Sequence, residues 1–221
     1  MDLPLHLILV AGGSSRRFGG GDKLLADLNG APVFVHALRR LTPLVTGKTV
    51  IVIPKGRKAE FENEAFPYIR DLSLIWCEGG DTRSASVRNG MAALGKSSGL
   101  AAVHDAARPL ADTRLLQKLC EAALVSGAAL PGKPVADTLW KSRNEMLEST
   151  VEREEVYAVE TPQVFNIDLW RKAHEMLPDA ELTDDAGLLR KAGFPVTLVI
   201  NPEPNFKLTT PADLLMLRAL I

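Results

Sequence analysis

Three cations follow a short apolar segment near the start of the chain. Residues 5–11 are almost continuously apolar, which is typical of a parallel strand buried on both faces. Glycines and serines come next, then Arg16 and Arg17, and Lys23 follows soon after a run of three glycines. Glycine lets the backbone approach a ligand closely, and free amides beside arginine and lysine charges suit a polyphosphate. A flexible basic loop is the alternative, although loops after the first strand of an open α/β sheet usually face its binding crevice.

A second polar loop, 78–83, follows another expected strand and continues into Ser84 and Ser86. Its two glycines free the backbone, while Asp81 and Ser86 can hydrogen-bond the polar edge of a ring. An ordinary capped turn, with Asp81 or Thr82 as the helix N-cap, explains the same residues equally well. Both interpretations stay open at this point.

A third loop, 104–109, places Asp105 and Arg108 at the end of a further expected strand. A carboxylate there can face Mg²⁺ with a phosphate, or a sugar hydroxyl. Arg108 can reach a phosphate or form a structural salt bridge with Asp105. Because the carboxyl ends of parallel strands meet at one edge of a sheet, we expect the three loops to line one crevice. Lys207, just before a late helix, matters only if the sheet brings it to the same edge.

One motif is misleading. Residues 90–97 match the phosphate-loop pattern GxxxxGK[ST] letter for letter. Such a loop must follow a strand and open a helix, so that the amides of the helix N-terminus face the phosphates. Here the match falls in the last turns of an expected helix, where Gly95 is better explained as a C-cap. We therefore do not expect nucleotide to bind there, and no GxGxxG fingerprint is present either.

Composition narrows the class of protein. The 221 residues suit one large α/β domain, and 26 basic against 27 acidic residues give a net charge of −1, which does not favour a general nucleic-acid or membrane surface. Cys77 and Cys120 lie in apolar contexts and are expected to be buried, reduced thiols without metal-binding spacing. No secretory signal pattern and no apolar run of about 18 residues is found, so we expect a cytoplasmic protein.

Strands and helices alternate along most of the chain. This alternation predicts an α/β fold with a doubly wound, mostly parallel sheet. The expected strands are 5–11, 48–53, 72–77, 100–104, 128–130 and 195–200. The expected helices are 32–41, 57–65, 83–94, 112–125 with Asp112 as cap, 168–177, 183–192 with Thr183 as cap, and a terminal helix from Pro211.

The alternation breaks after residue 131. Strand-like fragments at 138–140 and 156–159 flank the polar run 141–155. This pattern predicts a protruding β-arm, about 134–157, on a single domain that spans 1–221. The arm is too short to fold alone, and a second copy of the chain is the simplest cover for the exposed Trp140.

Together these residues resemble the 2-C-methyl-D-erythritol 4-phosphate cytidylyltransferase family over essentially the whole chain. The resemblance depends on the order and spacing of short motifs at 11–17, 79–83, 86–87, 104–109, 134–138, 151–153, 161–163, 183–186 and 205–209. It implies a fold like that of nucleotide-diphospho-sugar transferases. It also implies Mg²⁺-dependent transfer of a cytidylyl group from CTP to 2-C-methyl-D-erythritol 4-phosphate, in a homodimer whose arms cross to the partner.

The resemblance also implies roles for single residues. Nucleotide binding and cytosine selection fall to Ala11, Gly12, Gly13, Gly80, Asp81, Arg83 and Ser86. The catalytic cations are Arg17 and Lys23 at the triphosphate, with Arg153 and Lys207 positioning the acceptor. Further acceptor contacts fall to Asp105, Arg108, Thr138, Thr161 and Thr183. Asp105 is also the expected metal ligand, and Thr138 and Arg153 are expected to serve the partner's site.

Three places depart from the family's pattern, and one of them is Trp140, which replaces a commonly basic residue on the arm. Asp22 and Leu24 flank Lys23 where the family usually has proline and glutamine. Pro204 stands where the family has an aspartate before its Asn-Ile-Lys motif, so this acceptor contact is either missing or supplied by Glu203.

Three other functions compete with this one. A ribitol 5-phosphate cytidylyltransferase is the nearest rival, but Ala107 and the pair Glu152-Arg153 fit the methylerythritol enzyme better. Uridylyl- or guanylyltransferases share only the first glycine loop. A non-catalytic nucleotide-binding protein would not need both Lys23 and Lys207, and simple turnover distinguishes it.

Overall fold

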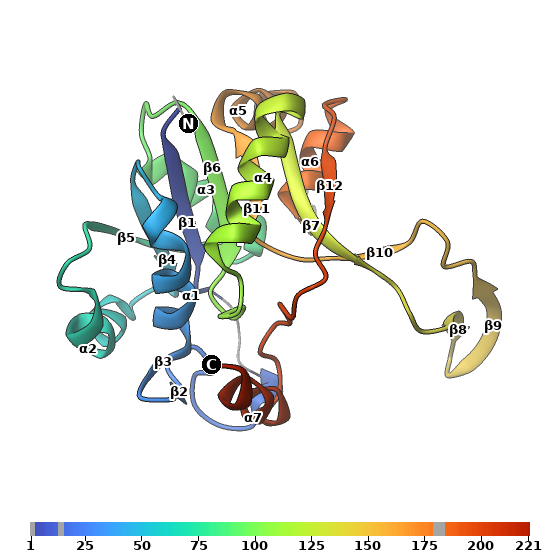
Figure 1. Ribbon diagram of the computed structural model, residues 1–221, viewed down its shortest axis with the longest axis horizontal. Helices are drawn as coiled ribbons and strands as arrows, with labels where there is room; N and C mark the ends of the chain where they lie inside the picture. The colour runs from blue at the N-terminus through green and yellow to red at the C-terminus, as the bar shows by residue number, and fades with distance from the viewer. Residues whose placement is uncertain (1–2, 13–15, 179–183) are drawn as a thin grey trace.

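The computed structural model describes residues 3–12, 16–178 and 184–221, so Gly13 and Thr183 lie outside the described part of the chain. Within the described residues, a central eight-stranded sheet has the order β10-β7-β11-β6-β1-β4-β5, and β12 pairs with β7 (Figure 1). The strands are β1 (Leu5–Val10), β4 (Thr49–Ile53), β5 (Leu74–Glu78), β6 (Leu100–Asp105), β7 (Ala128–Pro134), β10 (Tyr157–Val159), β11 (Gln163–Asn166) and β12 (Thr197–Ile200). Four pairings, β1 with β4, β1 with β6, β4 with β5 and β7 with β12, are parallel, which confirms the mostly parallel α/β sheet.

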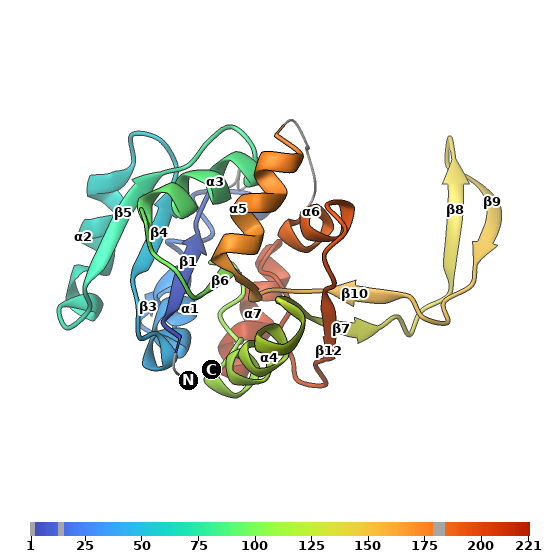
Figure 2. The same ribbon diagram turned by 90° about the horizontal axis from the view of Figure 1, so that it is seen from above.

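Helices cover both faces of this sheet, and Figure 2 shows α3, α5 and α6 on one side with α1 and α4 on the other. They are α1 (Val33–Leu41), α2 (Lys58–Ile69), α3 (Arg83–Ala93), α4 (Thr113–Ser126), α5 (Ile167–Met176), α6 (Asp185–Lys191) and α7 (Pro211–Leu220). Among the helices in the described residues, none combines the length and the apolar character needed to cross a membrane.

The two faces of the central strand β1 pack into two different hydrophobic cores. Leu7 and Leu9 belong to the core that holds the buried residues of α1 and α4, whereas Ile8 and Val10 belong to the core of α3 and α5. This division follows from the alternation of side chains along a strand. All residues of β1, β4 and β6 are buried, which explains why these segments are almost continuously apolar.

The short strand β11 was not expected. It lies antiparallel between β6 and β7, with Val164 opposite both Ala102 and Ala129. Four residues are too few for a clear period in the sequence, so the sheet is less uniformly parallel than the alternation predicted. The strand expected at 128–130 is also longer than predicted. It continues as β7 to Pro134, where it pairs with β10.

The expected cap of α6 was also wrong. The helix begins at Asp185 and its N-cap is Asp184, whose carboxylate accepts a hydrogen bond from the Gly187 N–H at 2.8 Å. Aspartate and threonine are both good N-caps, so the residue type alone does not decide between positions 183 and 184.

The excursion between β7 and β10 contains a hairpin of β8 (Leu139–Arg143) and β9 (Met146–Val151). Among the described residues these two strands pair only with each other, and Figure 2 shows them projecting from the body of the molecule. The residues 141–155, expected as a polar run between two strand-like fragments, contain the end of β8 and the whole of β9. The tight turn is made by Asn144 and Glu145, both at positive φ.

The hairpin leaves large apolar side chains exposed. Trp140 is 49% exposed, and Met146 and Leu147 are 72% and 64% exposed. Apolar groups gathered on a projecting element need a cover, so they are consistent with an interface.

The misleading phosphate-loop match occupies the end of α3, as its sequence context predicted. Gly90 packs α3 against the sheet, since a Cβ there would lie 2.6 Å from Ile8 Cγ2. Gly95 follows the helix at a φ of +64°. The carbonyls of Leu94 and Gly95 accept hydrogen bonds from Lys48 and Arg171 at 2.8 and 2.6 Å. Cations at these carbonyls are what the negative end of a helix favours, so no anion site is formed.

We expect Lys96→Ala to leave nucleotide affinity within about twofold of the parent, because Lys96 is exposed beyond a helix C-terminus. Titration calorimetry with a nucleoside triphosphate measures this, and Lys23→Ala serves as the positive control. Loss of affinity in the Lys96 variant alone would place the nucleotide at the end of α3.

Candidate active site

The three polar loops predicted to converge do so. They follow β1, β5 and β6 at the same edge of the sheet and line a cavity of about 530 Å³. Nine of the predicted site residues line it: Gly12, Arg17, Lys23, Gly80, Asp81, Arg83, Ser86, Asp105 and Lys207. Lys207 comes from the segment before α7, so the sheet does bring this late lysine to the strand ends.

Lys23 is held inside a group of cations. Its Nζ donates to the Leu208 carbonyl at 2.9 Å. Burial, together with the nearby charges of Lys207 and Arg17, lowers the pKa of Lys23, and Asp105 only partly offsets this. Cations that converge and destabilise one another's charge form a site for a polyanion, whose binding relieves the repulsion.

The departures beside Lys23 have a structural explanation. Asp22 accepts a hydrogen bond from the Leu24 N–H at 2.9 Å and is ion-paired with Arg57. Leu24 is buried in the core at 4% exposure. Lys23 is therefore anchored on both sides, by an ion pair and by an apolar contact. Arg57, at the start of α2, was missed from the sequence, where it looked like an ordinary surface cation.

The second loop packs tightly against the first turn of α3. A Cβ on Gly80 would lie 2.4 Å from Ala85 Cβ, so this position requires glycine, and one on Gly79 would lie 2.7 Å from Ser86 Oγ and would displace that hydroxyl. Thr82 is the N-cap, since its Oγ1 accepts from the Ala85 N–H at 3.0 Å. This selects Thr82 over Asp81 as the cap.

Ser86 and Asp81 have different surroundings within this loop. Ser86 is 3% exposed, and its hydroxyl donates to the Thr82 carbonyl at 3.0 Å while accepting from the Gly80 N–H at 3.1 Å. The Asp81 side chain is 93% exposed and lies 3.3 Å from Lys55. Ser86 therefore shapes the loop, whereas Asp81 is accessible to a ligand at its rim.

Asp105 is the charged centre of the cavity. Its carboxylate is 2.7 Å from Lys207 Nζ, 3.4 Å from Arg83 Nε and 3.9 Å from Arg108 Nε. Burial alone would raise the pKa of Asp105, but the charges of Lys207 and Arg83 outweigh it and hold the pKa far below its usual range. Asp105 is therefore ionised at any physiological pH. Arg108 is its most distant partner, so the simple Asp105–Arg108 salt bridge is not the main interaction.

Thr161 and Arg108 lie behind the cavity. The Thr161 hydroxyl accepts from the Asp105 N–H and contacts His104 Nδ1, both at 3.0 Å. Burial lowers the pKa of His104 to about 4, and its Nε2 lies 2.9 Å from the Arg108 carbonyl. A carbonyl only accepts, so Nε2 carries the proton and Nδ1 accepts from Thr161. The hydroxyl of Thr161 is thus already used within the protein.

The remaining predicted residues are placed elsewhere. Ala11 is buried and its N–H donates to the Val52 carbonyl at 2.7 Å, so only its carbonyl can serve a ligand. Thr138 lies between β7 and β8, and Arg153 between β9 and β10, where its guanidinium bonds the Ala136 carbonyl. Both belong to the projecting excursion and do not line this chain's cavity.

A divalent cation fits the cavity only if the substrate supplies most of its ligands. Among the described residues, no group of three acidic, histidine or cysteine side chains could hold a metal ion by itself. Mg²⁺ typically uses one or two carboxylates together with substrate phosphates. Asp105 can supply such an oxygen, so a nucleotide would have to provide most of the ligands.

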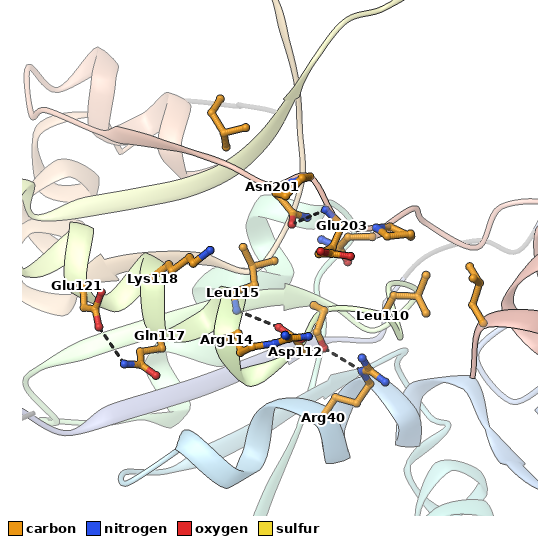
Figure 3. Close-up of a pocket in the computed structure, with 16 residues that line it drawn as sticks. Arg40, Leu110, Asp112, Arg114, Leu115, Gln117, Lys118, Glu121, Asn201 and Glu203 are labelled. Atoms are coloured by element: carbon orange, nitrogen blue, oxygen red, sulfur yellow. Dashed lines mark hydrogen bonds and ion pairs between the residues drawn. The ribbon is translucent and has the colours of Figure 1, made fainter.

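A second cavity, of about 510 Å³, lies between α4 and the loop after β12 (Figure 3). Its lining mixes both signs of charge, and Arg114 is 3.3 Å from Asp112. None of the predicted site residues lines it. Glu203 does, and it does not line the cavity that contains Lys207. Glu203 therefore lies outside the cleft that holds Lys207.

Comparison with known proteins gives one consistent result. The profile of the family 2-C-methyl-D-erythritol 4-phosphate cytidylyltransferase matches residues 5–221. The enzyme of that name from Dehalococcoides mccartyi is 36% identical over 218 residues, which cover 97% of this chain and 94% of that one. A protein of the same name from Geobacillus thermodenitrificans is 36% identical over 219 residues, covering 97% and 95%. The crystal structure of the Thermus thermophilus protein of that name is 33% identical, with a TM-score of 0.78 over 96% of both chains.

The lowered pKa of Lys23 gives a pH prediction. The affinity for a nucleoside triphosphate should fall as the pH rises, because Lys23 of the free protein loses its proton. Since its pKa is lowered, this fall should begin at a lower pH than for a lysine of ordinary pKa. Lys23→Arg should move the fall to higher pH, since a guanidinium stays charged. Calorimetric titrations from about pH 7.5 to 10.5 measure both. Identical pH curves for parent and variant would exclude Lys23 as the responsible group.

Proposed function

The chain belongs to the 2-C-methyl-D-erythritol 4-phosphate cytidylyltransferase family, and we propose that its cleft transfers the cytidylyl group of CTP to 2-C-methyl-D-erythritol 4-phosphate. The products are 4-diphosphocytidyl-2-C-methyl-D-erythritol and pyrophosphate, in non-mevalonate isoprenoid biosynthesis. The observation that carries the proposal is that Arg17, Lys23 and Lys207 line one cavity with Asp105, at the edge of the sheet where β1, β5 and β6 end.

The reaction requires charge compensation and positioning more than proton transfer. An oxygen of the acceptor phosphate attacks the α-phosphorus of CTP, a new P–O bond forms, and the bond to the pyrophosphate oxygen breaks. A phosphate monoester is already deprotonated near neutral pH, so no general base is needed. Arg17 and Lys23 bind the triphosphate and stabilise the charge that develops on the leaving pyrophosphate, while Lys207 directs the acceptor phosphate.

The second loop is suited to recognise the base. Gly79 and Gly80 keep the backbone close to the cleft, and Ser86 fixes its path. Backbone amides and carbonyls at this rim can read the polar edge of cytosine, with Asp81 exposed beside them. Arg83, oriented by Asp185 at 3.1 Å, points its charge into the same cavity.

We propose Mg²⁺ as the metal, with Asp105 as the protein's ligand. When bound, the ion would neutralise phosphate charge and polarise the α-phosphate. The two unpaired cysteines, Cys77 and Cys120, and the need for CTP support a cytoplasmic site of action.

We further propose that the arm completes the partner's site in a homodimer. Two observations support this: Thr138 and Arg153 lie in the excursion that holds the projecting hairpin, and that hairpin exposes Trp140, Met146 and Leu147. An interface over these side chains would bury them, and would allow Arg153 to reach the acceptor phosphate of the neighbouring cleft.

The substrate assignment predicts Mg²⁺-dependent release of pyrophosphate from CTP only when 2-C-methyl-D-erythritol 4-phosphate is present. A coupled pyrophosphate assay compares it with ribitol 5-phosphate, and CTP with UTP and GTP, under identical conditions. Faster turnover of ribitol 5-phosphate would make the acceptor wrong, and faster turnover of UTP or GTP would make the base wrong. No turnover with any pair would favour a non-catalytic nucleotide-binding protein.

The trans arrangement predicts complementation between two inactive variants. Lys23→Ala and Arg153→Ala should each be nearly inactive, because each removes a cation from the transition state. In a mixed dimer, one site has both intact residues and the other has both lesions. Random exchange makes about half of the dimers mixed, so about a quarter of all sites should recover.

The control pair is Lys23→Ala with Arg17→Ala, whose lesions belong to the same chain's cleft and should not complement. Native mass spectrometry confirms that mixed dimers form. Mixed dimers of Lys23→Ala and Arg153→Ala without recovered activity would contradict the arm exchange.

A further inference from the structure

Glu160 is a buried carboxylate that the mechanism above does not use. It directly follows β10, precedes Thr161 and is 8% exposed. Its N–H donates to the Pro131 carbonyl at 2.9 Å, which ties it to β7. A buried carboxylate is unfavourable unless it is hydrogen-bonded or paired, so its partners indicate its role.

Two buried asparagines bind the same oxygen of Glu160. Nδ2 of Asn201 and Nδ2 of Asn205 each donate to Oε2 at 2.9 Å. The two asparagines are 4% and 1% exposed. Nδ2 of Asn205 also donates to the Thr161 carbonyl at 2.9 Å. Only the nitrogen of an amide can face a carboxylate favourably, so Glu160 fixes the orientation of both side chains.

This cluster holds the segment that carries Lys207. The Asn205 carbonyl accepts from Arg108 Nη1 at 2.7 Å. Two residues further along the chain, Lys207 reaches Asp105 at 2.7 Å. A shift of Asn205 would therefore move two cations of the acceptor side together.

Glu160 also contributes charge. Burial lowers the pKa of Arg108, and the charges of Asp105 and Glu160 act in the opposite direction. Within the described residues Arg108 Nε is buried without a hydrogen-bond partner, so the stability of its charge depends on nearby carboxylates.

We propose that Glu160 is a positioning residue for the acceptor side of the cleft, acting through Asn205 on Arg108 and Lys207 without touching substrate. The inference rests on the proposed function, in which Lys207 directs the acceptor phosphate. The CTP side should respond much less. Lys23 does contact the Leu208 carbonyl, but Leu208 is held separately, because its N–H donates to the Ala107 carbonyl at 2.8 Å.

Glu160→Gln tests this directly, since it keeps the shape and one accepting oxygen but removes the charge. We expect the KM for the acceptor to rise roughly tenfold, with the KM for CTP within about twofold of the parent. Glu203→Gln is the matched control, because it neutralises an exposed carboxylate on the segment between Asn201 and Asn205. It should leave the KM for the acceptor and the KM for CTP within about twofold of the parent. Equal changes in both constants, or no change in either, would overturn the inference.

A reciprocal pair separates a specific contact from general loosening of the fold. Asn201→Asp alone places two carboxylates together and should weaken acceptor binding. Combined with Glu160→Gln, it again places a carboxylate opposite an amide at the contact between residues 160 and 201, so the acceptor KM should fall below that of Asn201→Asp alone. Failure of the double variant to recover, while it remains folded by circular dichroism, would also contradict the proposal. This double variant carries the test if Glu160→Gln alone does not fold.

Hydrogen exchange tests the same contact without any substrate. The backbone amides of residues 203 and 205–207 should exchange faster in Glu160→Gln than in the parent or in Glu203→Gln, whereas the amide of Leu208, held by the Ala107 carbonyl, should not change. If the parent fails to turn over the acceptor, the proposed function is wrong, and the exchange result still decides whether Glu160 holds this segment. If the parent is active and the exchange and the acceptor KM are both unchanged, only the role of Glu160 is wrong.

Discussion

One buried carboxylate determines how the cleft is held together. Asp105 is 8% exposed and meets Arg83, which lies 22 residues before it, and Lys207, which lies 102 residues after it. Without its charge, these cations and Arg108 would face one another in a partly buried space, and their repulsion would push the loops apart. Asp105 thus allows cations from distant parts of the chain to remain close together before any anion binds.

The features that the sequence predicted are those encoded by short local patterns. β1 and β6 were recognisable because every residue in them is buried. Once the parallel strands are placed, their carboxyl ends must share one edge, so Arg17, Gly80 and Asp105 were expected together, and they line one cavity. The false phosphate loop could be recognised for an equally local reason. It lies at the C-terminal end of a helix, where backbone carbonyls and the negative end of the helix dipole disfavour a phosphate.

The features that the sequence did not predict depend on partners far away in the chain. β11 has four residues and finds its place only through β6 and β7. Arg57 and Asp22 are 35 residues apart, and Asn201 and Glu160 are 41 apart. Polar residues on loops have many possible partners, and no period in the sequence selects among them. The charged residues of the site could therefore be named from the sequence, whereas the contacts that orient them are visible only in the structure.

The grouping of cations explains how such a site can bring two anions together. On the proposed function, a phosphate monoester must approach a bound triphosphate, and the repulsion between them opposes reaction. Lys23 and Lys207 already lie close enough to lower the pKa of Lys23, and the fold offsets their repulsion through Asp105 and the backbone carbonyl of Leu208. The cations are therefore in place before the reaction, and their mutual repulsion is relieved as negative charge gathers between them. An arrangement fixed in advance stabilises the transition state without reorganising at the moment of transfer.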